Sequence, residues 1–164
     1  MALVGCSSTT ERLAGSALDG GIQSNGTVGS DHVKIGEEWW AAFPVPFNAS
    51  AQRLEITGAE LASVPEGLKV IEYGAYDRRD TDGFALLSKQ GSPGMPKFDK
   101  LKNHIGEANG VSGKSESAIY YLARLKVTGP IHANVTGCEF KYRQGSREYT
   151  QTLECDVALR LETA

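Results

Sequence analysis

Residues 137–161 read GCEFKYRQGSREYTQTLECDVALRL, and apolar and polar side chains alternate along both halves of this stretch. Alternation with a period of two is typical of β-strands that are buried on one face and solvated on the other. Between the halves, Gln144-Gly145-Ser146-Arg147 supplies residues that favour a turn. The stretch therefore predicts an antiparallel β-hairpin, whose buried face carries Cys138, Phe140 and Tyr142, then Tyr149, Leu153, Cys155, Val157, Leu159 and Leu161.

The length of the hairpin loop decides how its two cysteines face each other. A two-residue type II′ loop, Gly145-Ser146, sets Cys138 opposite Leu153, whereas a four-residue loop sets Cys138 opposite Cys155. A disulfide needs Cα atoms within about 7 Å, so it requires the longer loop, or the shorter one with a β-bulge. We expect a Cys138–Cys155 disulfide, because both thiols share the buried face and the expected compartment is oxidising. The alternative is two small apolar residues that merely pack.

Length and composition predict one all-β domain. The chain has 164 residues, 19 of them glycine, and a net charge of −3. No helices that would connect parallel strands are recognisable, so we expect an immunoglobulin-like, two-sheet antiparallel β-sandwich over residues 32–164. No basic patch with interleaved aromatic residues occurs, which argues against a nucleic-acid partner. No apolar run approaches the ~20 residues of a membrane-spanning helix, and we expect no cofactor.

Several further segments of the chain are candidate strands. Gln52–Val64 changes phase at Gly58, which predicts a β-bulge there. Leu68–Tyr76 is apolar on both faces and is therefore expected to be a central strand. Residues 88–117 show no periodic pattern of apolar residues, which predicts a long connection that is either functional or mobile. The candidate strands besides the hairpin are Val33–Phe43, Gln52–Val64, Leu68–Tyr76, Phe84–Leu87 and Ala118–Thr128.

The first residues of the chain suggest a lipid anchor. Leu3-Val4-Gly5-Cys6 resembles the lipobox of bacterial lipoproteins, in which the cysteine is lipidated. Only Met1 and Ala2 precede it, so we expect the natural start to lie upstream, or the sequence to have been shortened, if the match is not accidental. Residues 7–31 are rich in Ser, Thr, Gly and Asn, which predicts a flexible tether, so residues 1–31 are expected to be a signal remnant and tether.

This interpretation makes the chain an extracytoplasmic, membrane-anchored lipoprotein of the bacterial cell envelope. Its contact with the membrane would be limited to the lipid on Cys6. The alternative is a disordered N-terminus with an unmodified thiol.

The sequence offers little catalytic chemistry. A hydrolytic nucleophile needs a histidine base and an orienting carboxylate. His32 lies at the boundary of the expected tether, and His104 and His132 lie in expected loops. We therefore predict no catalytic residue.

One acidic turn resembles a calcium loop only weakly. Asp77, Asp80 and Asp82 are closely spaced before Gly83, but two arginines lie among them and Ser88 stands where a bidentate Glu is expected. We predict a solvated polar turn and no metal site. The alternative function is a small extracytoplasmic hydrolase or calcium-binding protein whose site lies in residues 77–117.

A group of aromatic residues is the candidate binding site. Trp39 and Trp40 are adjacent on an expected strand and must point to opposite faces. The other members of the group are Phe43 and Phe47, with Tyr73 and Tyr76. An exposed tryptophan beside apolar residues would anchor an envelope protein or a glycan. The alternative is that the long connection covers the second tryptophan. We therefore predict a non-catalytic module for recognition or envelope structure.

Two segments resemble secreted lipoproteins of actinobacterial type. They are Leu54–Leu68, with its Val64-Pro65-Glu66-Gly67-Leu68 turn, and the Tyr142–Tyr149 hairpin. The similarity extends over about residues 33–161. The resemblance implies an immunoglobulin-like β-sandwich outside the bacterial cytoplasm, and it implies no particular activity.

Overall fold

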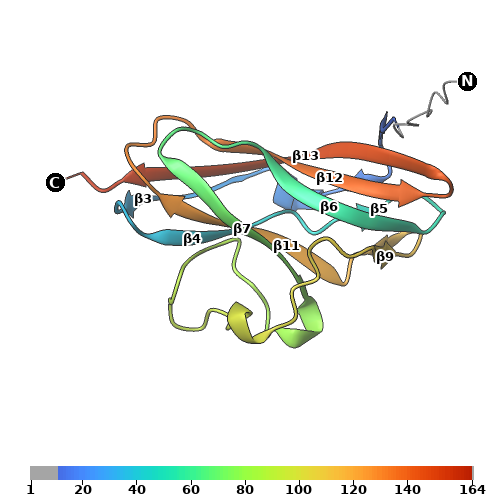
Figure 1. Ribbon diagram of the computed structural model, residues 1–164, viewed down its shortest axis with the longest axis horizontal. Coiled ribbons are helices and arrows are strands. Elements are labelled where there is room, and N and C mark those ends of the chain that lie inside the picture. The colour runs from blue at the N-terminus through green and yellow to red at the C-terminus, as the bar shows by residue number, and fades with distance from the viewer. Residues whose placement is uncertain (1–10, 164) are drawn as a thin grey trace, which may run out of the picture.

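The computed structural model describes residues 11–163, which form strands in three sheets connected by turns and three short 3-10 helices. The two larger sheets lie face to face, with the main hydrophobic core between them (Figure 1). The prediction of an all-β sandwich is therefore confirmed. Among the described residues, no helix is long and apolar enough to cross a membrane.

The first sheet has the order β1-β13-β12-β6-β9, and β3 also pairs with β13. The second sheet has the order β7-β11-β4-β8, and the third, a small one, has the order β10-β5-β2. The strands of the first sheet are β1 (Leu13–Ala14), β3 (Thr27–Val33), β6 (Leu54–Ser63), β9 (Asn109–Val111), β12 (Val135–Gln144) and β13 (Arg147–Leu161). Those of the second sheet are β4 (Glu38–Ala42), β7 (Leu68–Asp77), β8 (Leu87–Lys89) and β11 (Ile119–Val127). The remaining elements are β2 (Leu18–Asp19), β5 (Phe47–Asn48), β10 (Ser115–Glu116), η1 (Gly21–Ser24), η2 (Arg78–Asp80) and η3 (Phe98–Lys100).

Aromatic side chains from both sheets meet in the main core. Phe140 of β12 lies edge-on to Phe43, with ring centroids 5.8 Å apart, and to Tyr121 of β11, at 5.5 Å. Edge-to-face pairs of this kind contribute about 0.5–1.5 kcal/mol beyond the burial of their area. The alternating pattern of β12 predicts that Phe140 points inward, and this residue does contact aromatic side chains on the opposite side of the core.

The β12–β13 hairpin has the shorter of the two predicted loops. Gln144 pairs with Arg147, so only Gly145 and Ser146 lie between the strands. Gly145 has φ 62°, which a type II′ turn requires at its first central position. The tight turn therefore fixes the register of the hairpin.

A β-bulge brings the two cysteines together within this register. Cys138 pairs with Leu153, and the register then shifts between Thr136 and Cys138, around Gly137 with φ 78°. Cys138 and Cys155 consequently lie 5.8 Å apart at their Cα atoms and form a disulfide. The predicted disulfide is confirmed, and it forms through the alternative that combined the short loop with a bulge.

The predicted bulge in β6 is also present. Lys141 pairs with Gly58, whereas the next residue, Tyr142, pairs with Ile56. The phase change of the apolar residues at Gly58 in the sequence therefore reports a true irregularity of the strand.

The expectation that Leu68–Tyr76 is a central strand is wrong, because β7 lies at the edge of the second sheet. Its two apolar faces have different covers: the main core lies on one side, and a connecting segment packs against Tyr76 on the other. A register shift opposite Arg124 and Leu125 leaves Ile71 unpaired and 41% exposed. Two-sided apolarity reflects burial from both faces and does not report the position of a strand within its sheet.

The expectation of a flexible tether up to Asp31 is wrong for the described residues 11–31. They contain β1, β2, η1 and most of β3, and both β1 and β3 pair in parallel with the outer edge of β13. Main-chain pairing makes little demand on side chains, so a segment rich in Ser, Thr and Gly can form it. Gly29 is even required there, since a Cβ atom would lie 2.1 Å from the carbonyl oxygen of Ala158. Cys6 lies outside the described residues.

We call residues 78–108 the covering segment, because they fold over the outer face of the second sheet. In Figure 1 this segment forms the projection below β7 and β11. It contains η2, β8 and η3 and closes a second hydrophobic cluster outside the main core. Its strand β8 begins three residues later than the predicted Phe84–Leu87 and ends two residues later.

Removal of the disulfide tests the hairpin. The double substitution Cys138→Ala and Cys155→Ala releases a loop with a sequence separation of 17 residues. In the chain-entropy model this lowers the free energy of unfolding by about 3 kcal/mol, which corresponds to a decrease of roughly 6–12 °C in Tm. Calorimetry of both proteins measures the change. Titration of three reactive thiols without reductant would show that the bond does not form in solution.

Candidate functional site

The outer face of the second sheet carries large aromatic side chains. Trp40 of β4, Tyr76 of β7 and Tyr120 of β11 all point away from the main core, because alternate residues of a strand face opposite sides. Trp40 and Tyr76 are only 2% and 3% exposed. The low exposure of these rings is due to the covering segment, whose apolar side chains pack against them.

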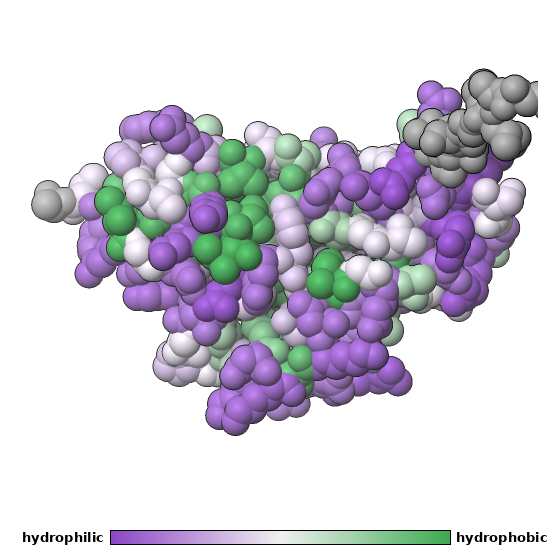
Figure 2. Space-filling view, viewed as in Figure 1, coloured by the Kyte–Doolittle hydropathy of each residue, from purple (hydrophilic) through white to green (hydrophobic). Residues whose placement is uncertain are grey.

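Phe98 of η3 is the residue that fastens the covering segment to the sheet. Its ring centroid lies 4.7 Å from that of Trp40 and 4.6 Å from that of Tyr76. Earlier in the segment, Phe84 stacks on Tyr120, with ring centroids 4.2 Å apart. The outer surface of the projection is mostly hydrophilic (Figure 2), as expected for a segment whose apolar side chains point inward.

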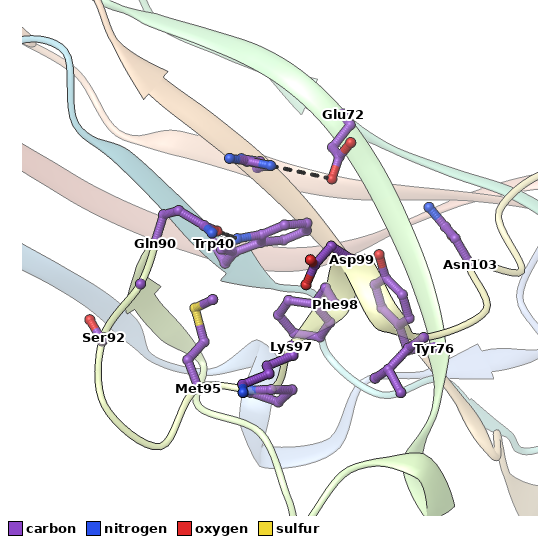
Figure 3. Close-up of a pocket in the computed structure, with 14 residues that line it drawn as sticks. Trp40, Glu72, Tyr76, Gln90, Ser92, Met95, Lys97, Phe98, Asp99 and Asn103 are labelled. Atoms are coloured by element: carbon purple, nitrogen blue, oxygen red, sulfur yellow. Dashed lines mark hydrogen bonds and ion pairs between the residues drawn. The ribbon is translucent and has the colours of Figure 1, made fainter.

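Beside these contacts the cover is incomplete and leaves a hollow of about 500 Å³ (Figure 3). The sheet contributes one wall and residues 90–103 contribute the other. Ligand sites in proteins commonly have volumes of about 300–1,000 Å³. We call this space the hollow; its walls include Trp40, Glu72, Tyr76, Phe98, Asp99 and Arg124.

Arg124 of β11 is held firmly at the edge of the hollow. Its guanidinium group lies over the Trp40 ring, 5.6 Å from the centroid, and its Nε donates to the Glu38 carboxylate at 2.9 Å. Its Nη1 lies 3.8 Å from a carboxylate oxygen of Glu72. The indole N–H of Trp40 donates to the side-chain oxygen of Gln90, which ties the sheet to the covering segment. These contacts hold the guanidinium group of Arg124 in a defined position.

The hydroxyl group of Tyr76 projects into the hollow, toward the space shared by Glu72 and Asp99 (Figure 3). Burial, together with the carboxylates of Glu72 and Asp99, raises the pKa of Tyr76 to about 12, although Arg124 opposes the shift. The phenol therefore stays protonated at neutral pH and can donate a hydrogen bond. It makes no hydrogen bond to any residue within the described range 11–163.

The four predicted binding residues do not form one site. Trp39 and Trp40 point to opposite faces as predicted, but Trp39 packs against the main core and Trp40 is covered, which is the alternative outcome. Phe43 is buried in the main core. Phe47 is 37% exposed and borders a different hollow, beside Ile22.

The alternative function was predicted for residues 77–117, and residues 90–103 of that range line the hollow. The acidic and histidine residues named for it do not. Asp77 is bound by Arg79 at 2.6 Å, and this pairing lowers the pKa of Asp77 to about 2. His104 pairs with Glu107 at 2.9 Å. Asp80 and Asp82 lie in the turn after β7, and no group of three potential metal ligands occurs within residues 11–163.

Substitution Phe98→Ala tests whether this ring holds the covering segment. Loss of a buried phenylalanine costs about 3–5 kcal/mol, and we expect the loss to fall on the segment rather than on the main core. Amide hydrogen exchange should become faster in residues 87–103 and stay unchanged in β12 and β13.

The control for this experiment is Ile22→Ala, because Ile22 is 89% exposed and its loss should change stability by less than about 0.5 kcal/mol. Unchanged exchange in residues 87–103 of the Phe98→Ala variant would contradict the proposed attachment.

Calcium addition tests the acidic turn. A ligand that binds only the folded state raises Tm by mass action, and the Asp77 carboxylate is already engaged by Arg79. We therefore expect millimolar calcium chloride to leave Tm unchanged in calorimetry. An upward shift that disappears in the Asp77→Asn variant would instead establish a calcium site.

Comparison with known proteins does not assign the chain to a family. No protein-family model matches it, and no curated protein matches it. Among solved structures, it is similar to part of one described as the VesB protease of Vibrio cholerae, with a TM-score of 0.36 at 11% identity. The similarity covers 80% of this chain and 29% of that one, so this chain spans less than a third of that protein's length. A similarity at this level supports no conclusion about fold or activity.

Proposed function

We propose that the chain is a non-catalytic recognition module of the bacterial cell envelope, which binds its ligand in the hollow. The observation that carries this proposal is the guanidinium group of Arg124, already held in place at the edge of the hollow, together with the hydroxyl of Tyr76, which makes no hydrogen bond to any residue within the range 11–163. Groups that are already in place lose little conformational entropy when a ligand binds, so a site of this kind favours binding.

The lining of the hollow supports binding over nucleophilic catalysis. A serine nucleophile requires a neighbouring base, and Ser92 lines the hollow without a histidine beside it among the lining residues. Tyr76 is protonated at neutral pH, as an ordinary tyrosine is, and its raised pKa keeps it protonated in more alkaline solution as well. Glu72 faces the guanidinium group of Arg124. These side chains act as hydrogen-bonding and ionic contacts.

The domain is proposed to have the immunoglobulin-like topology. The order β7-β11-β4 in one sheet and β13-β12-β6 in the other supports it, because these correspond to strands D-E-B and G-F-C of that fold. The parallel pairing of β3 with the last strand is a further supporting feature. The disulfide differs from the inter-sheet bond of antibody domains, since it joins two neighbouring strands of one sheet.

The proposed location is the outer side of the bacterial membrane, with a lipid on Cys6. The Leu3-Val4-Gly5-Cys6 motif supports it, and so does the disulfide, because such bonds persist in oxidising compartments. Strand β1 begins at Leu13. Residues 7–12 thus separate Cys6 from the first sheet and can span at most about 22 Å. A distance this short would hold the domain close to the membrane.

A matched pair of charge reversals tests the proposed function. Glu72→Lys places a cation in the hollow beside Arg124, whereas Glu66→Lys makes the same change at an exposed turn that does not line the hollow. We expect the wild-type chain and Glu66→Lys to co-sediment with purified bacterial envelope fragments. Glu72→Lys should bind about two- to fivefold more weakly, since a like charge beside Arg124 at this half-exposed position costs up to about 1 kcal/mol.

Thermal melting of each variant separates lost binding from lost folding. Equal co-sedimentation of folded Glu72→Lys and wild-type protein would overturn the assignment of recognition to the hollow.

A further inference from the structure

Three loops and the segment that leads into β1 meet at one end of the sandwich. The loops are residues 49–53, 112–114 and 145–146, and the leading segment is residues 11–12. The backbone N–H of Lys114 donates to the Ser50 carbonyl at 2.9 Å, and the Gln144 side chain donates to Ser50 Oγ at 2.8 Å. Arg12 lies 3.8 Å from the carboxylate of Glu148, beside the hairpin turn. We call this group of loops and leading residues the hairpin end.

The two ends of the sandwich carry opposite charge. The hairpin end has a net charge of +2, from Arg12, Arg53, Lys114 and Glu11. The connections at the opposite end are residues 34–37, 64–67, 128–134 and 162–163, and they have a net charge of −2, from Lys34, Glu37, Glu66 and Glu162. An anionic surface would therefore attract the first end and repel the second.

The basic side chains of the hairpin end are exposed and only partly neutralised. Arg53 and Arg143 share a single carboxylate, that of Glu55, at 3.0 Å and 2.7 Å. Lys114 and Arg147 have no carboxylate partner among residues 11–163. These two cations are thus available to a phosphate group, which guanidinium and ammonium groups both bind.

Charge alone does not single out the hairpin end, because the covering segment also has a net charge of +2. The two differ in position: the covering segment projects from the side of the sandwich, whereas the turn between β12 and β13 lies at one end of its long axis (Figure 1). The chain enters the domain at this end, since Leu13 pairs with Tyr149. Residues 7–12 span at most about 22 Å. A lipid on Cys6 would therefore hold the hairpin end, and not the opposite end, near the membrane.

We infer that the hairpin end docks on a membrane surface that contains anionic phospholipids, an inference that rests on the proposed lipid anchor at Cys6. Lys114 and Arg147 contact the phosphate groups of the lipids. Each basic side chain at such a surface strengthens binding about fivefold. In this orientation the acidic end points away from the membrane, and the hollow, on the side of the sandwich, remains open to solvent.

Co-sedimentation of the full-length chain with lipid vesicles tests the inference. One kind of vesicle contains equal parts of phosphatidylglycerol and phosphatidylcholine, and the other contains phosphatidylcholine alone. In about 10 mM salt we expect the chain to bind the anionic vesicles at least about 30-fold more tightly. Salt at about 1 M should remove this preference, because the Debye length falls from about 30 Å to about 3 Å.

A pair of double variants locates the contact. Lys114→Gln combined with Arg147→Gln should weaken binding to the anionic vesicles about 25-fold, since two cations are lost. The matched control, Lys100→Gln combined with Lys126→Gln, removes the same charge from the covering segment and from the far end of β11. All four side chains are exposed, and the control should weaken binding less than about threefold. Thermal melting of both double variants checks that they are folded.

Equal binding to the two kinds of vesicle, or an equal loss in the two double variants, would overturn docking through the hairpin end. The proposed recognition function is tested separately, because Glu72→Lys and Glu66→Lys change the net charge equally and any attraction to lipid charge is common to both. If Glu72→Lys alone still weakens envelope binding when vesicle binding fails, recognition by the hollow stands and only the membrane contact falls.

Discussion

Burial of both faces of the β7-β11-β4 sheet is the constraint on which the rest of the structure depends. Tyr120 and Tyr121 are neighbours on β11, so they point to opposite faces, and both are buried. The first sheet covers Tyr121, and the covering segment covers Tyr120. Leaving one such ring in water would cost about 1.5–3 kcal/mol. The covering segment is therefore part of the fold, and the hollow exists where this cover stops short of Arg124.

The sheet edges impose a second requirement, because unpaired strands invite association with other chains. β1 and β3 occupy the outer edge of β13, which makes residues 13–33 part of the domain. At the edge of β7, the Asn103 side chain accepts from the Ala75 N–H at 2.9 Å and donates to the Tyr73 carbonyl at 3.2 Å. The bulge at Ile71 interrupts the remaining part of this edge. The covering segment thus protects an edge as well as a face.

The sequence predicts the parts of the fold whose side chains alternate. The hairpin, its disulfide and the bulge at Gly58 could be predicted, because a period of two and a change of phase are local signals. The pairing of residues 13–33 with β13 could not, since main-chain hydrogen bonds leave little trace in composition. The hollow was missed for a different reason: Trp40, Tyr76, Phe98 and Arg124 lie on three strands and one connection. The aromatic residues Trp40 and Tyr76 and the unpatterned stretch 88–117 are signals in the sequence, but the contact of Trp40 with a ring 58 positions away in the chain is not.

The two walls of the hollow have different roles, and this difference determines how the site can change. Glu72, Tyr76 and Arg124 are held by the strand ladders and by the stacking of Arg124 on Trp40, so their positions follow from the fold itself. Asp99 lies on the covering segment, which is attached to the sheet mainly through Phe98. Substitutions among the exposed residues of that segment alter the hydrogen-bonding groups while leaving the core unchanged. In the proposed function, the sheet would fix where the ligand lies and the covering segment would set which ligand is accepted, as is usual for connections placed on a rigid scaffold.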